Sequence, residues 1–244
     1  MRRNIVRIFA PIALAISLHA QTTPSVVPIS KEGHHHLVLD NDYVRVYSVE
    51  VAPHSETLYH QHDLDYIFVT LGDSDVDSVR VGEAPVHLLL KDGEVRFTKG
   101  GFAHKAVNNS DKPFKNVTIE LKGPQQQPKS CEQCSAKVWK TDKSDRPACT
   151  EVTLFETDEF RVSYWHLTNL FNAGPRVALK DNLLVGLNKF SLGTAATGMG
   201  PHHRNYLTYR QGTVRWNDKE SVWHRYYWKA DDGDADFVTI ELRE

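Results

Sequence analysis

This chain has little methionine and no large excess of charge of either sign. Among the 244 residues there are only two Met, and the formal net charge at pH 7 is -2. A nearly neutral chain has no electrostatic reason to bind nucleic acid or an anionic membrane. Segments with helical periodicity are few, whereas Thr, Val and aromatic residues are plentiful, and 14 Gly and 11 Pro separate short runs. This composition predicts an all-β protein.

Cysteine is also scarce, and the three that occur lie in one region, at Cys131, Cys134 and Cys149. Because three is an odd number, at most one internal disulfide forms, and the sequence does not select the pair. The C-x-x-C pair lacks the following His of a haem attachment site, and no fourth zinc ligand stands nearby. We expect one disulfide in a connecting segment.

Signatures of nucleophilic catalysis and of phosphate binding are missing. The chain shows no Ser–His–Asp or Cys–His pattern and no Gly-rich phosphate loop. An enzymatic activity would therefore depend on other groups, and the histidines are the candidates.

Apolar runs are short, and the most distinct one lies at the N-terminus. Arg2, Arg3 and Arg7 precede the apolar run Ile8–Leu18, which is too short to span a bilayer, and Ala20 ends an imperfect cleavage site. This order is typical of a secretory signal peptide. We therefore predict a signal peptide over residues 1–20 and a periplasmic or secreted protein without a membrane segment after cleavage.

Two pairs of similar segments indicate an internal repeat. Leu39–Val46 (LDNDYVRV) resembles Phe155–Val162 (FETDEFRV) at an offset of 116 (155 − 39), and Val117–Leu121 (VTIEL) recurs as Val238–Leu242 at an offset of 121 (238 − 117). Matches in the same order with nearly equal offsets predict two similar domains. We assign residues 21–36 to an N-terminal segment, 37–123 to the first domain, 124–150 to a Cys-containing linker and 151–244 to the second domain.

Residues with the spacing of metal ligands occur in the first domain. His60 and His62 stand two apart in a predicted strand, so their side chains face the same side. Asp65 follows where a bend can bring its carboxylate to the same point, and His104 lies in a second motif, Gly93–Asn108 (GEVRFTKGGFAHKAVN). Imidazole nitrogens with a carboxylate oxygen suit one divalent Fe, Mn, Ni, Cu or Zn ion. The alternative is a polar pocket without metal.

These stretches resemble the two motifs of the cupin superfamily. The first family motif is His-x-His, three or four residues, Glu, six residues and Gly. This chain has His60-x-His62, two residues, Asp65, six residues and Gly. The second family motif is Gly, five residues, Pro-x-Gly, two residues, His, three residues and Asn, and Gly93–Asn108 matches it with Lys99 in place of Pro.

The resemblance, which spans about residues 37–121, implies two tandem cupin barrels of the double-stranded β-helix or jelly-roll type. It implies a metal held by His60, His62, Asp65 and His104. Because Asp is shorter than Glu, Asp65 could bind directly, bind through water, or leave a site of three histidines. Strand phase further suggests an apolar pocket wall at Ile67 and Val69, with Phe102 at its mouth.

The second domain retains the strand pattern but loses the ligands. At the offset of 116, Arg176 and Ala178 stand opposite the His-x-His pair and Asp181 opposite Asp65. In the second motif Gly212 corresponds to Gly93 and His224 to His104, with one extra residue between them, and one His with one Asp cannot make the same metal site. We expect a degenerate cupin without metal, with a structural, dimerising or substrate-covering role, and leave a homodimer open. We interpret the other histidine groups, Gly33–His36 and His202–His203, as a solvated segment and a loop.

The resemblance implies dioxygenases, decarboxylases, isomerases and lyases that act on small organic molecules. We rank an exported, metal-dependent dioxygenase first, because exported bicupins with this ligand set resemble flavonol-type dioxygenases. The rival interpretation is a non-catalytic bicupin that binds a sugar-like small molecule or has a structural role, since a fold does not determine a function.

Overall fold

The computed structural model describes residues 24–123, 135–136, 149–167, 180–196, 205–218, 224–228 and 233–243. These residues form strands and one 3-10 helix, η1 (Ile29–Lys31), so the all-β prediction is confirmed. Within the same ranges, no helix has the length and apolar character that crossing a membrane requires. The predicted signal peptide, the Cys131–Cys134 pair and His202–His203 lie outside the described residues.

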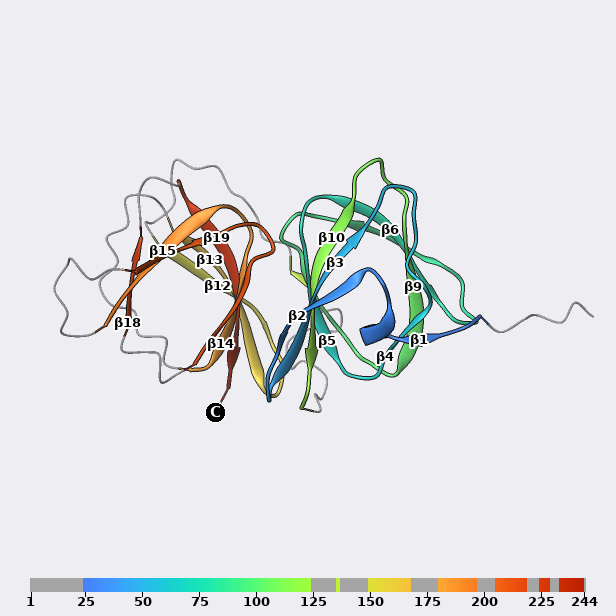
Figure 1. The fold of residues 1–244 in the computed structure, drawn as a ribbon, viewed down its shortest axis with the longest axis horizontal. Coiled ribbons are helices and arrows are strands. Elements are labelled where there is room, and N and C mark those ends of the chain that lie inside the picture. The colour runs from blue at the N-terminus through green and yellow to red at the C-terminus, as the bar shows by residue number, and fades with distance from the viewer. Residues whose placement is uncertain are drawn as a thin grey trace, which may run out of the picture.

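The N-terminal half forms a barrel of two sheets, which we call barrel 1 (Figure 1). One sheet has the strand order β1 (Val27–Pro28), β4 (His60–His62), β9 (Phe102–Asn108), β6 (Ser74–Arg80) and β7 (Val86–Leu90). The other has the order β11 (Ser135–Ala136), β8 (Val95–Thr98), β5 (Tyr66–Thr70), β10 (Phe114–Leu121), β3 (Val44–Val51) and β2 (His35–Asp40). The predicted N-terminal segment thus supplies residues to β1, η1 and the start of β2.

The C-terminal half repeats this arrangement as barrel 2. Its larger sheet has the order β12 (Cys149–Glu156), β13 (Phe160–Leu167), β19 (Ala235–Leu242), β14 (Asn182–Gly186) and β17 (Val214–Asn217). Its smaller sheet has the order β16 (Asn205–Tyr209), β15 (Phe190–Ala196) and β18 (His224–Trp228). The two VTIEL segments lie in β10 and β19, each a strand with a neighbour on both sides, as the repeat predicts.

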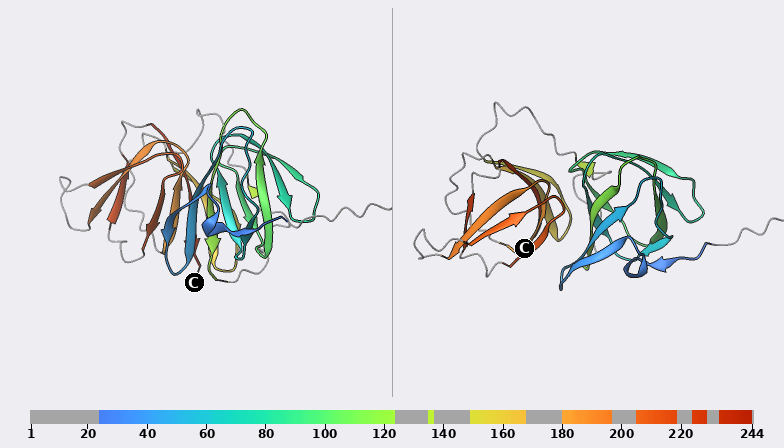
Figure 2. Two further views of the ribbon diagram at one scale, coloured as in Figure 1. Left: turned by 45° about the vertical axis from the view of Figure 1, so that its right-hand side comes forward. Right: turned by 45° about the horizontal axis from the view of Figure 1, so that its top comes forward.

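The two barrels pack against each other within the chain, and two further views show the same side-by-side arrangement (Figure 2). Val117 and Ile119 of barrel 1 belong to one buried cluster with Val238 and Ile240 of barrel 2, all with no exposed surface. Because its other face lines the interior of barrel 1, strand β10 is buried on both sides.

Candidate metal centre

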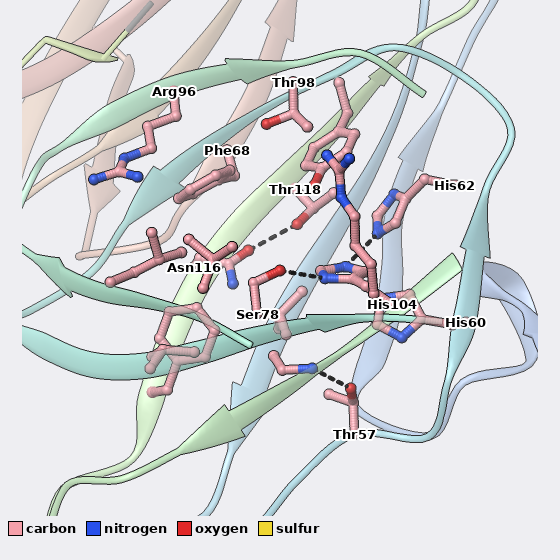
Figure 3. Close-up of a pocket in the computed structure, with 18 of the residues that line it drawn as sticks. Thr57, His60, His62, Phe68, Ser78, Arg96, Thr98, His104, Asn116 and Thr118 are labelled. Atoms are coloured by element: carbon pink, nitrogen blue, oxygen red, sulfur yellow. Dashed lines mark hydrogen bonds between the residues drawn. The ribbon is translucent and has the colours of Figure 1, made fainter. Parts of the chain in front are cut away.

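Strand pairing brings three of the predicted ligands together inside barrel 1. β4 pairs antiparallel with β9, and His60 stands directly opposite His104 in this pair. Because side chains alternate along a strand, His60 and His62 point to the same side, and both are almost fully buried. Figure 3 shows the three imidazoles converging at one end of a cavity.

The distances between the imidazoles fit a shared metal ion. His62 Nε2 lies 3.2 Å from His104 Nε2, and the rings of His60 and His104 are 4.7 Å apart between centroids. Two nitrogens bound to one metal at the usual bond lengths lie about 3.0–3.4 Å apart in octahedral or tetrahedral geometry. The observed separation falls in this range.

Hydrogen bonds outside the cluster orient two of these rings. His60 Nδ1 donates to the carbonyl of Leu58 at 2.9 Å, so Nε2 keeps its lone pair. Among the described residues His60 Nε2 is buried without any hydrogen-bond partner. Ser78 Oγ lies 3.0 Å from Nδ1 of His104. A hydrogen bond at Nδ1 that leaves Nε2 free is the usual arrangement of a metal-binding histidine.

A fourth histidine, His35, joins the cluster, which corrects the interpretation of Gly33–His36 as a solvated segment. His35, His60 and His62 each offer a nitrogen within 4.8 Å of the others. Glu32 holds His35 by accepting a hydrogen bond from Nδ1 at 2.6 Å. Burial alone would raise the pKa of Glu32, but hydrogen bonds from His35 and His34 keep it far below its usual range. A carboxylate that orients a ligating imidazole is common in metal sites.

The sequence carried a signal for His35 that its neighbours obscured. His35 is the first residue of strand β2 and pairs with Val49 of β3. This pairing directs the imidazole into the barrel. Three consecutive histidines before a strand show no preferred member, so only the register of β2 on β3 selects His35.

The structure does not bring Asp65, which the resemblance implies as a ligand, to the histidines. Its carboxylate accepts a hydrogen bond from Lys99 Nζ at 2.7 Å and another from the backbone N–H of Gly100 at 2.8 Å. Lys99 is the residue that replaces the Pro of the family motif, and it draws the short Asp side chain toward the loop before β9. Asp65 does not line the cavity.

The cavity beside the histidines has a volume of about 390 Å³. Phe102 lines it, as expected, but Ile67 and Val69 do not: both are fully buried in the cluster between the barrels. The neighbouring positions of β5, Tyr66 and Phe68, line the cavity instead. The error arose because β5 is buried on both faces, so its apolar run has no alternation from which the inner face could be recognised.

Burial keeps the imidazoles of His60, His62 and His104 neutral. Loss of hydration, together with the neighbouring imidazoles, lowers the pKa of His60 to about 4 and that of His104 to about 3. The pKa of His62 is lowered for the same reasons. Neutral imidazole is the form that binds metals. Burial also raises the pKa of Tyr66, whose ring stacks on His62 at 4.2 Å, to about 12, so this phenol keeps its proton.

Comparison with known proteins identifies the fold. No protein-family model and no curated protein matches the chain. Among solved structures, AerE from Microcystis aeruginosa matches with a TM-score of 0.58 and 13% identity, over 86% of this chain and 97% of that one. A Cupin 2 conserved barrel domain protein from Leptotrichia buccalis matches with a TM-score of 0.54 and 8% identity, over 86% and 88%. A salicylate 1,2-dioxygenase from Pseudaminobacter salicylatoxidans matches with a TM-score of 0.54 and 12% identity, over 84% and 75%. The chain is therefore a protein of the cupin fold, built as two tandem jelly-roll barrels.

Proposed function

We propose that barrel 1 holds one divalent transition metal and that the chain is an exported, metal-dependent dioxygenase of small organic substrates. The metal would be held by His60, His62 and His104, with His35 as the fourth ligand. The observation that carries the proposal is the convergence of buried imidazole nitrogens, one of them without a hydrogen-bond partner among the described residues, at the end of a cavity.

The imidazole donors favour some of the candidate metals over others. Imidazole suits Fe, Ni, Cu and Zn, whereas Mn prefers oxygen ligands. With Asp65 held by Lys99, four imidazoles favour the first group over Mn. When bound, such a metal supplies a Lewis acid and, if it is redox-active, a centre for oxygen activation.

The residues of the chain position and shield the site. Glu32, Leu58 and Ser78 orient His35, His60 and His104, respectively. Phe68 and Phe102 line the cavity and exclude water from the reacting groups. One structural neighbour is a salicylate 1,2-dioxygenase, which supports ranking an oxygenase before a lyase or isomerase.

Metal analysis tests the proposal. The protein from about residue 21 onward is purified without chelators or affinity histidines, beside a His60→Ala/His62→Ala variant. We expect about one equivalent of Fe, Ni, Cu or Zn in the wild type and none in the variant. Oxygen uptake is then measured with a panel of small aromatic acids.

Two results would contradict the proposal. A wild type that stays free of metal after reloading would make the cluster a polar pocket. A metal-loaded protein that takes up a small molecule, yet neither consumes oxygen nor releases product, would favour the rival, a non-catalytic binding bicupin.

A further inference from the structure

We infer that Arg80 binds the carboxylate of the substrate, so that the cavity accepts a small monocarboxylic acid with an apolar body. The inference rests on the proposed function, since it names the substrate class for that same cavity. It is carried by the position of Arg80, by the state of its guanidinium and by the other charges around the cavity.

The sheet register places Arg80 beside the histidines. β6 pairs with β9 so that Arg80 stands directly opposite His104. Residues opposite each other in an antiparallel pair share one face, with Cβ atoms about 4.5–5.5 Å apart. Alternation along β6 puts Val76, Ser78 and Arg80 on the cavity side, and all three line the cavity.

The guanidinium of Arg80 is held in place without being neutralised. Its Cζ lies 4.0 Å from the centroid of the Phe102 ring, a cation–π contact that restrains the side chain. In the described part of the chain no carboxylate forms an ion pair with Arg80. Stacking on an aromatic face leaves the N–H groups at the edge of the guanidinium free for a planar carboxylate.

The other charges near the cavity leave Arg80 as the anion-binding group. Arg96 also lines the cavity, but Glu94, which is fully buried, pairs with its Nη2 at 2.7 Å. Figure 3 shows Arg96 at the opposite end of the view from His60, His62 and His104. Glu83 is exposed and makes no ion pair with Arg80. One available cation beside the histidines fits one carboxylate.

The remaining walls describe the rest of the ligand. Apart from the histidines, these charged groups and a few hydroxyl and amide side chains, the cavity is lined by apolar residues, among them Val49, Phe68, Val76, Leu88, Leu90 and Phe114. A second charge on the ligand would be buried against them without a partner, which is costly. In addition, four neutral imidazole ligands would leave the positive charge of a bound metal uncompensated. This charge also favours an anion beside Arg80.

Titration calorimetry tests the inference with benzoate as the probe and benzamide as its neutral counterpart. Both are titrated into metal-free and zinc-loaded protein. The variants are Arg80→Met, which removes the cation, Arg80→Lys, which keeps the charge without the planar fork, and Lys105→Met as the control. Lys105 lies on the adjacent strand β9, pairs with Glu56 and does not line the cavity.

We expect wild-type protein to bind benzoate at least about 10-fold more tightly than benzamide, because a charge-assisted hydrogen bond is lost with the amide. Arg80→Met should weaken benzoate binding by a similar factor, Arg80→Lys should restore part of it, and Lys105→Met should leave it unchanged. Equal binding of benzoate and benzamide by the wild type, no benzoate binding at millimolar concentration, or an unaltered affinity in folded Arg80→Met would each overturn the inference.

The same data separate the inference from the proposed function. If Arg80-dependent binding occurs in metal-free protein while metal analysis fails, the substrate class stands and the metal-dependent activity does not. If the protein holds metal and consumes oxygen but does not distinguish benzoate from benzamide, the metal-dependent activity stands and the proposed substrate class does not.

Discussion

Each imidazole in the cluster depends on a hydrogen bond made by its other nitrogen or on packing around its ring. The Glu32 carboxylate accepts a hydrogen bond from His35 Nδ1, and the Leu58 carbonyl accepts one from His60 Nδ1. The ring of Tyr66 stacks on that of His62. These contacts orient the rings, and burial keeps His60, His62 and His104 neutral. The site is therefore a property of the residues behind the ligands as much as of the ligands.

Substitution of His35 and of Asp65 distinguishes the observed cluster from the motif-based ligand set. His35→Ala should lower metal affinity about 10-fold or more, because a ligating nitrogen is lost. Asp65→Ala should leave metal content unchanged, because this carboxylate bonds Lys99 and Gly100 instead. Competition with a chromophoric chelator measures both affinities. A loss of metal affinity in Asp65→Ala, with unchanged affinity in His35→Ala, would identify Asp65 as the ligand instead.

Glu120 is a buried charge whose removal should stabilise the protein at neutral pH. It is 2% exposed, and among the described residues its Oε2 accepts no hydrogen bond, while Arg45 Nη1 lies 3.6 Å away. Burial raises the pKa of Glu120 more than Arg45 lowers it. A raised pKa in the folded state means that stability falls as pH rises from the ordinary value of 4.5 through the folded value.

Glu120→Gln should therefore raise the free energy of unfolding by roughly 1 kcal/mol at pH 7, because the amide carries no charge to desolvate. The difference should shrink toward zero as the pH falls below 4.5, because Glu120 then becomes protonated in both the folded and the unfolded state. Urea unfolding at the two pH values measures it. A destabilised variant at neutral pH would show that the Arg45 pair outweighs burial.

Two loops, rather than strands alone, position the entrance to the site. The loop before β9 packs on the loop between β4 and β5: a Cβ on Gly100 would lie 2.4 Å from the backbone carbon of Leu64. The N–H of Gly101 donates to the His62 carbonyl at 2.7 Å, and Asp65 joins the same loops through Lys99. Asp65, the acidic residue of the first motif, thus ties the loop of the second motif to the loop of the first.

Gly100→Ala should destabilise the protein by about 1–3 kcal/mol, since backbone atoms cannot move aside as a flexible side chain would. Gly33→Ala is the matched control, because a Cβ there meets nothing within 4 Å. Thermal unfolding compares the two. Equal melting temperatures would show that the loops separate at little cost.

The two barrels share one buried cluster, so the whole molecule is held together through its two VTIEL strands. Tyr43 of barrel 1 stacks on Trp216 of barrel 2 at 5.5 Å, and Gln211 Nε2 donates to Asp92 Oδ1 at 2.9 Å. The outer faces of these sheets are covered within the chain. Barrel 2 therefore supports the sheet on which Tyr66 and Thr118 line the cavity.

Ile240→Ala, a change in barrel 2, should lower the stability of the whole chain by about 2–5 kcal/mol, because it opens a cavity in the shared cluster. Metal release and loss of β-sheet signal should coincide in one thermal transition. Leu207→Ala, which removes a side chain that is 40% exposed, should have a much smaller effect. Two separate transitions, with the first barrel unaffected, would contradict this coupling.

The sequence by itself determined the two-barrel β fold and the grouping of three histidines. These features are local or repeated: the spacing of His60 and His62 follows from strand alternation, and the repeated VTIEL segments occupy equivalent central strands. Only the tertiary structure decided the rest. The register of β2 on β3 places His35 in the cluster, and the hydrogen bonds from Lys99 and Gly100 hold the Asp65 carboxylate away from it. The packing of β5 against barrel 2 determines which face of this strand lines the cavity. Each of these depends on contacts between residues distant in the chain, which spacing along the sequence does not encode.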